Sequence, residues 1–194
     1  MRILITSWSA YGHLYPMLPI ARAAQRTGHA VVIATGPNLA PHVEQLGFTA
    51  WPVGHSIAEE LEVYDAVHPH PETLPEEERA VAEVSDLFVP GAAKRATELV
   101  PCAMEWRPDV VIHEAVELAG AIAAACSGAR HVVHSLGLQW PEMINVLPPL
   151  FEPLCAQWQV PELADALHHA PYLDICPPSL RPEGQSVWRQ VHPL

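Results

Sequence analysis

The stretch "RILITSWSAYGHLYPMLPIARAAQRTGHAVVIAT" (residues 2–35) decides the fold class. Its opening, Arg2 to Ser7, is a short apolar run rich in β-branched residues, which predicts a buried strand. Residues 14–28 then place apolar side chains on one helical face and end at a glycine, which predicts a helix. Residues 30–35 return to a β-branched run. This strand–helix–strand succession predicts a βαβ unit with parallel strands.

The same alternation continues along most of the chain. We predict helices over residues 37–47, 91–106, 115–128 and around 151–167, and strands over residues 48–53, 108–114, 129–135 and 172–177. Residues 54–90 are acidic and rich in proline, and they resist assignment. The pattern predicts an α/β fold, a Rossmann-like doubly wound parallel sheet with helices on both faces and strand order 3-2-1-4-5. Ligands bind such sheets at the carboxyl ends of the strands, in the crevice where the winding reverses.

Composition limits the class of protein. The chain has 194 residues, enough for one ordinary domain or one lobe of a larger enzyme. Lys and Arg number 10 against 22 Asp and Glu, so the net charge of −12 disfavours nucleic acid and anionic membranes as partners. No apolar run approaches the ~20 residues that span a bilayer, and we expect no signal peptide. The four cysteines lie far apart without metal-ligand spacing, so we expect a reducing, cytoplasmic location.

Two residues at the predicted crevice carry candidate chemistry. His13 lies in the loop "SAYGHLYP" (residues 9–16), just ahead of a predicted helix, and Glu114 ends the predicted fourth strand. The topology brings them to the same crevice. A carboxylate on one imidazole nitrogen fixes the tautomer and leaves the other nitrogen as a base, and the positive end of the helix favours a neutral ring. The alternative is that His13 caps the helix while Glu114 is solvated.

Several other functions lack their motifs. The loop after the first strand has one glycine, so it is not a GxGxxG dinucleotide turn, and the chain has neither GxxxxGK[ST] nor GxSxG. We predict no metal site, because the pairs His68–His70 and His168–His169 have no third ligand at a recognisable spacing. His113 and His134 lie on predicted strands and are expected in the core, although His134 could border the pocket.

Aromatic and apolar side chains gather in the loops on the carboxyl side of the predicted sheet. Together they could line an apolar acceptor pocket, although each taken singly could also be ordinary packing. The residues predicted for this pocket are Tyr11, Trp51, Tyr64, Phe88, Trp140 and Met143.

Four stretches of the sequence carry a resemblance to a known family. They are the opening residues 2–37 with the SxxGHxxP loop from Ser9 to Pro16, "GFTAWPVG", "WRPDVVIHEAVELAGAIAAACSGARHVVHSLG" and "PYLDICPPSLRPEG". In combination they resemble the amino-terminal, acceptor-binding domain of family 1 glycosyltransferases with the GT-B fold. The likeness is greatest to the actinobacterial branch that decorates polyketides and related natural products. It covers most of the chain and is weak over residues 55–90.

The resemblance implies an inverting sugar transfer from a dTDP- or UDP-sugar to a hydroxyl of a natural-product aglycone. It implies that His13 is the general base, that Glu114 orients it, and that Ser9 and Gly12 approach the donor. It implies no tightly bound cofactor. Residues 1–194 would form a single acceptor-binding domain without the second, nucleotide-sugar-binding domain. We therefore expect the chain alone to transfer no sugar, and its exposed interdomain face could support self-association.

Two other functions remain open at this point. The chain could be a stand-alone, non-catalytic protein that binds an apolar ligand or helps a partner transferase. It could also be a different Rossmann-like enzyme that uses His13 and Glu114 for hydrolysis, although no nucleophile motif supports that function.

Overall fold

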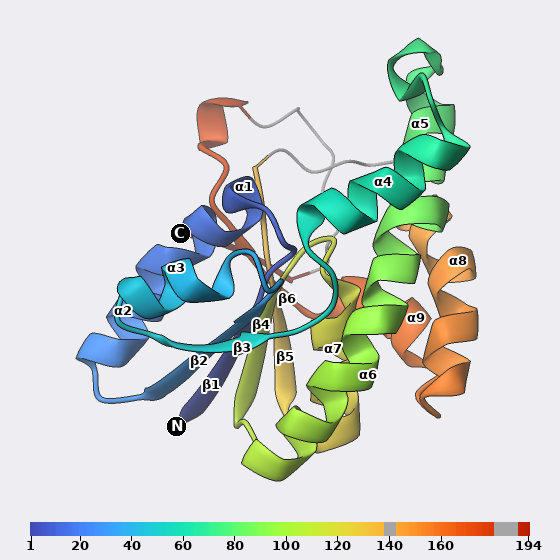
Figure 1. The fold of residues 1–194 in the computed structure, drawn as a ribbon. Coiled ribbons are helices and arrows are strands. Elements are labelled where there is room, and N and C mark those ends of the chain that lie inside the picture. The colour runs from blue at the N-terminus through green and yellow to red at the C-terminus, as the bar shows by residue number, and fades with distance from the viewer. Residues whose placement is uncertain (138–142, 181–189) are drawn as a thin grey trace.

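A computed structural model describes residues 1–137, 143–180 and 190–194 (Figure 1). Within these residues the strands form one all-parallel sheet of order β3-β2-β1-β4-β5-β6-β7. The strands are β1 (Arg2–Thr6), β2 (Ala30–Thr35), β3 (Thr49–Pro52), β4 (Val110–Glu114), β5 (Arg130–His134), β6 (Pro171–Asp174) and β7 (Gln190–Pro193). The predicted order 3-2-1-4-5 is confirmed, and β6 and β7 extend the sheet beyond β5.

Helices cover both faces of this sheet, as predicted. In Figure 1, α2 and α3 lie on one side and α6 to α9 lie on the other, while α4 and α5 project beyond the carboxyl ends of the strands. The helices are α1 (Tyr11–Leu14), α2 (Leu18–Arg26), α3 (Ala40–Gln45), α4 (Ile57–Val67), α5 (Glu76–Glu83), α6 (Val89–Trp106), α7 (Leu118–Ser127), α8 (Met143–Gln157) and α9 (Leu163–Ala166).

Alternation along the central strands builds two cores. Successive side chains of a strand point to opposite faces, so a buried parallel strand feeds both layers. Leu4, Val32 and Val111 lie in register and pack toward α6 and α7. Their neighbours Ile5, Ile33 and Ile112 also lie in register and pack toward α2 and α3. The apolar runs of the sequence are therefore buried on both sides, and they hold the loops after β1 and β4 beside each other.

The first helical segment begins earlier than predicted. Residues 11–14 form α1, Tyr15–Met17 form a 3-10 turn, and α2 follows from Leu18. Pro16 lies in the 3-10 turn and Pro19 lies in the first turn of α2, where a missing N–H costs little. The prediction that His13 precedes its helix is wrong by one turn, because the helix begins at Tyr11 and His13 lies inside α1.

Residues 54–90, left unassigned from the sequence, are largely helical. They contain α4, α5 and a π-helical turn at Val84–Phe88 that leads directly into α6. A capping box begins α4: the Glu59 N–H donates to Ser56 Oγ (3.3 Å) and the Ser56 N–H donates to Glu59 Oε2 (2.8 Å). The Ser-x-x-Glu spacing is the sequence signal for the start of this helix.

The helix expected around residues 151–167 differs in both bounds. It begins at Met143, ends at Gln157, and contains Pro148, Pro149 and Pro153; α9 is separate. Proline removes helical hydrogen bonds, which argues for a loop before residue 151. The helix forms nevertheless because its apolar face is buried in the larger core, through Leu147, Phe151, Leu154 and Cys155.

None of the helices described here combines the length and the apolar character needed to cross a membrane.

Candidate functional site

His13 and Glu114 meet at the carboxyl ends of the neighbouring strands β1 and β4. Nδ1 of His13 lies 3.0 Å from Oε1 of Glu114. The Glu114 side chain is fully buried, whereas that of His13 is 19% exposed. Two backbone groups hold the carboxylate in place: the N–H of Val116 donates to Oε2 (2.7 Å) and the N–H of Trp8 donates to Oε1 (3.3 Å).

The surroundings of Glu114 keep it ionised. Burial by itself raises the pKa of this carboxyl, but the hydrogen bond and charge of His13 and the two backbone N–H groups outweigh burial and lower the pKa below its usual range. A carboxylate only accepts hydrogen bonds, so Nδ1 of His13 carries the hydrogen in this pair. Nε2 is then the ring's acceptor, and a partly exposed imidazole of this tautomer can take a proton from a hydroxyl.

Trp8 packs against the His13 ring and was not singled out from the sequence. The two ring centroids lie 4.9 Å apart in an edge-on arrangement, and Phe88 also packs edge-on against Trp8, with a centroid distance of 5.5 Å. Trp8 is 7% exposed. Its place directly after the first strand was an available signal. The indole restricts the orientation of His13 and links it to the π-helical turn.

A second buried carboxylate, Glu117, has a different task. It caps α7 by accepting from the N–H groups of Ala119 (3.2 Å) and Gly120 (2.9 Å), and it also accepts from the Thr6 hydroxyl. Burial raises the pKa of Glu117 even though Arg95 and Thr6 favour the ionised form. The carboxylate that contacts His13 is Glu114.

Arg95 joins this region to α4 and is 1% exposed. Its Nη1 lies 3.5 Å from Oε1 of Glu117, and its Nη2 donates to Oε1 of Glu60 (3.0 Å) and to Oγ of Ser9 (3.3 Å). Sequence patterning alone does not predict a buried arginine here, because a helical arginine is usually solvated. The available signal was its position on the face of α6 that also carries Ala92, Ala96 and Leu99.

The structure gives Ser9 an internal role and leaves Gly12 open. Ser9 is fully buried, and its hydroxyl donates to the carbonyl of His55 (2.7 Å). The contact between Ser9 and a donor phosphate stays a prediction. Gly12 is exposed, and a Cβ added there would meet nothing within 4 Å. Packing therefore does not require a glycine at position 12, and its contact with the donor stays a prediction.

The residues predicted to line one acceptor pocket pack in different places. Trp51 packs edge-on against Trp106 at the end of α6, and Tyr64 is buried beside His68. Phe88 packs on Trp8, whereas Tyr11 is 51% exposed beside Tyr15. Trp140 and the side chain of Met143 lie outside the described residues.

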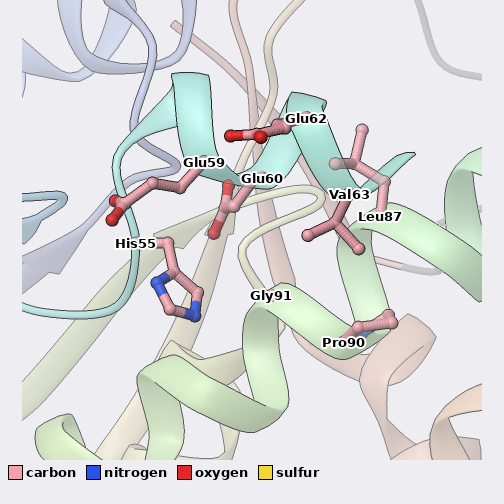
Figure 2. Close-up of a pocket in the computed structure, with 8 residues that line it drawn as sticks. All are labelled: His55, Glu59, Glu60, Glu62, Val63, Leu87, Pro90 and Gly91. Atoms are coloured by element: carbon pink, nitrogen blue, oxygen red, sulfur yellow. The ribbon is translucent and has the colours of Figure 1, made fainter. Parts of the chain in front are cut away.

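A cavity of about 390 Å³ lies between α4 and the beginning of α6 (Figure 2). It shares no residue with the predicted pocket. In Figure 2 the carboxylate of Glu60 points from α4 toward Gly91 on α6. The lining residues are His55, Glu59, Glu60, Glu62, Val63, Leu87, Pro90 and Gly91.

Four other histidines singled out from the sequence have polar partners or are buried. His68 Nε2 lies 2.8 Å from Asp86 Oδ2, and His70 Nδ1 lies 3.6 Å from Glu72 Oε1. His113 and His134 are fully buried on β4 and β5, in the core positions expected of them. Over residues 1–137, 143–180 and 190–194, no group of three or more His, Cys, Asp or Glu side chains is arranged to hold a metal ion.

Comparison with known proteins agrees with this topology. The profile of the family described as "Erythromycin biosynthesis protein CIII-like, N-terminal domain" matches residues 22–188. A glycosyltransferase from Streptomyces sp. SF2575, SsfS6, whose structure holds thymidine diphosphate, superposes with a TM-score of 0.77 at 26% identity over 98% of this chain and 52% of that one. The fold is thus a Rossmann-like lobe of the kind found in GT-B glycosyltransferases.

Curated relatives carry the same family signal. L-demethylnoviosyl transferase of Streptomyces niveus is 36% identical over 183 residues, which is 94% of this chain and 46% of that protein. Erythronolide mycarosyltransferase of Saccharopolyspora erythraea is 34% identical over 68% of this chain and 36% of that protein. The chain belongs to the erythromycin biosynthesis protein CIII-like, N-terminal domain family. It spans about half or less of the length of these relatives.

Proposed function

We propose that this chain is the acceptor-binding half of an inverting glycosyltransferase. Its substrates would be a dTDP- or UDP-sugar and a natural-product aglycone with a reactive hydroxyl. Family membership supports the reaction class, and the sugar transfers named in the relatives support the kind of substrate. The thymidine diphosphate held by the structural neighbour SsfS6 supports the nucleotide.

The observation that carries the proposal is the 3.0 Å contact between Nδ1 of His13 and the buried carboxylate of Glu114. In the proposed step, Nε2 of His13 takes the proton of the acceptor hydroxyl as the oxygen bonds to the anomeric carbon. The bond from that carbon to the nucleoside diphosphate breaks on the opposite face, which inverts the configuration. The carboxylate of Glu114 stabilises the imidazolium that forms. Proton transfer of this kind contributes about 10²–10⁴ in rate.

The donor would be held mainly by protein outside these 194 residues, in a second, nucleotide-sugar-binding domain. Gly12 supports an approach of the donor to this half, because its exposed backbone has no neighbouring atom where a Cβ would lie. We therefore expect the 194-residue chain on its own to transfer no sugar.

A transfer assay on the longer protein that contains this chain tests the proposal. His13→Ala should lower the turnover by about 10²–10⁴ while the affinity for the acceptor stays within a few-fold. His29→Ala is the matched control, because His29 precedes β2 at the opposite end of the sheet, beside the amino terminus. Turnover of His13→Ala close to that of the control would exclude His13 as the base.

A further inference from the structure

Trp8 contacts both members of the His13–Glu114 pair. Its main-chain N–H donates to Oε1 of Glu114 (3.3 Å), and its indole lies edge-on to the His13 imidazole, with an angle of 68° between the ring planes. The carbonyl of Trp8 accepts from the hydroxyl of Thr35 (3.4 Å), so its main chain is also held from the end of β2. Because Trp8 is buried, it can act on the imidazole without contacting a substrate.

The hydrogen bond to Glu114 does not by itself fix the imidazole. The torsion that turns a histidine ring is broad, so rotation can carry Nδ1 away from the carboxylate. The His13 side chain is 19% exposed, which leaves room for such rotation on the open side of the ring. A neighbouring ring that packs edge-on favours one orientation over others by about two- to tenfold. The indole of Trp8 supplies that preference only if the indole is itself held in place.

Phe88 holds the indole from the helical layer beside it. The two rings pack edge-on at 5.5 Å with 78° between their planes, and Phe88 is buried. Phe88 ends the π-helical turn, in which the N–H of Val89 donates to the carbonyl of Val84, five residues back. A π-helical turn contains one residue more than an α-helical turn, and such turns are frequent at functional sites. The extra residue sets the rotation of α6 relative to α5, and with it the direction of Phe88.

We propose that Phe88 is a positioning residue for His13 and acts through Trp8, an inference that rests on the function proposed above. The π-helical turn holds Phe88, Phe88 holds the indole, and the indole holds the imidazole with Nδ1 on Glu114. Nε2 then stays directed at the acceptor hydroxyl. Within the described residues Phe88 packs on the indole and forms no ring contact with His13 itself.

The π-helical turn is well supported on its other sides. Oδ2 of Asp86, within the turn, lies 2.8 Å from Nε2 of His68, the residue that follows α4. Val84 and Leu87 are buried in the larger core. A positioning residue is effective when packing locks its own side chain. The turn gives Phe88 that support from α4 and from the core, independently of the crevice.

Exchange of the Nδ1 hydrogen of His13 with water tests the inference on the 194-residue chain. The rate, measured by NMR magnetisation transfer from water, reports how often the imidazole leaves Glu114. Phe88→Leu should raise this rate by about two- to tenfold, the effect of losing one edge-on aromatic contact. Trp8→Leu should raise it at least as much. The double variant Trp8→Leu/Phe88→Leu should exchange no faster than Trp8→Leu, because Phe88 acts only through Trp8.

Trp106→Leu is the matched control. Trp106 ends α6, whereas Phe88 precedes it, and Trp106 also packs edge-on on an indole, that of Trp51, at 5.6 Å and 80°. This variant should change the exchange rate by less than about twofold, as expected for a separate site. An unchanged rate in Phe88→Leu, an equal rise in Trp106→Leu, or additive effects in the double variant would overturn the inference. If Trp8→Leu does not fold, the comparison of Phe88→Leu with Trp106→Leu decides.

Turnover of the longer protein separates this inference from the proposed base. Phe88→Leu should lower kcat for sugar transfer by about two- to tenfold and leave the KM for the acceptor within about twofold. A contact that only stabilises the fold would leave kcat of the folded enzyme unchanged. Unchanged kcat in Phe88→Leu, alongside loss of turnover in His13→Ala, would reject the positioning role alone. Normal turnover in His13→Ala would reject the proposed base, and the exchange rates would still decide whether Phe88 orients His13.

Discussion

Nδ1 of His13 lies 3.0 Å from Oε1 of Glu114, although 101 residues separate them in the chain. The contact follows from the pairing of β1 with β4 at the centre of the sheet. Backbone N–H groups of Val116 and Trp8 hold the carboxylate independently of the histidine. The pair is therefore built into the fold, and its consequences can be tested one residue at a time.

The variant Glu114→Gln should separate the effect of Glu114 on the orientation of His13 from its effect on folding stability. Both oxygens of the Glu114 carboxylate accept backbone hydrogen bonds, whereas the glutamine amide has only one oxygen that can accept. We therefore expect a stability loss of about 1–3 kcal/mol, measured by urea unfolding. Sugar transfer by the longer protein should fall by about 10²-fold or more, because the His13 tautomer is no longer held. Glu117→Gln also removes a buried carboxylate, but one that does not hold His13. A loss of turnover as large in Glu117→Gln as in Glu114→Gln would contradict the assignment.

Substitution by alanine should destabilise the protein at one glycine and leave its stability almost unchanged at another. At Gly120 a Cβ would lie 2.6 Å from the Cβ of His113 and 2.9 Å from Oε2 of Glu117, so Gly120→Ala should cost about 1–3 kcal/mol or more. At Gly12 the space is open, so Gly12→Ala should change stability by less than about 0.5 kcal/mol. If the donor passes over this position, Gly12→Ala should raise the KM for the nucleotide-sugar. An unchanged KM would remove Gly12 from the donor site.

The buried cation Arg95 should matter far more than its exposed neighbour. Arg95→Met leaves Glu60 and Glu117 buried without their cation, and we expect a loss of about 3–5 kcal/mol. Lys94 pairs with Glu98 at the surface, where both side chains are about 40% exposed, so Lys94→Ala should cost less than about 1 kcal/mol. Thermal or urea unfolding of the two variants measures the difference. Similar losses would mean that the Arg95 contacts contribute little.

Stability should fall on mild acidification because of His113. Complete burial, with a contribution from the neighbouring His131, lowers the pKa of His113 from 6.5 to about 4. The unfolded chain therefore binds a proton that the folded protein does not bind between these two pH values. The free energy of unfolding from this residue is fully present above pH 6.5 and declines by up to about 3 kcal/mol as the pH falls toward 4. Urea unfolding of wild type and His113→Gln across this range measures it, and equal slopes would contradict the expectation.

Periodicity was enough to predict the sheet but not the surroundings of the site. The apolar residues Leu4 and Ile5, with their partners on β2 and β4, indicate strands that are buried on both faces. The strand order follows from the right-handed helical connections between parallel strands. Helix α4 was hidden because its buried positions are Glu60 and Tyr64, which are polar. Glu60 is buried only because Arg95, 35 residues later, supplies its cation. A long-range pair of this kind leaves no periodic signal.

The aromatic residues around the site could not be predicted from the sequence for a similar reason. Trp51 was expected at the crevice, yet it packs against Trp106, because α6 ends over that part of the sheet. Trp8 was passed over although it packs on the His13 ring. Local sequence could place His13 and Glu114 at strand ends, but which aromatic rings surround them depends on how helices pack across the sheet.

The most direct test of the account is the tautomer of His13, read from the ring nitrogen shifts in ¹⁵N NMR spectra of the 194-residue chain at pH 8. We expect hydrogen on Nδ1 and a free Nε2 in the wild-type chain, and a mixed or reversed tautomer in Glu114→Gln. Hydrogen on Nε2 in the wild-type chain, or identical spectra for wild type and Glu114→Gln, would contradict the claim that Glu114 holds His13 as a base.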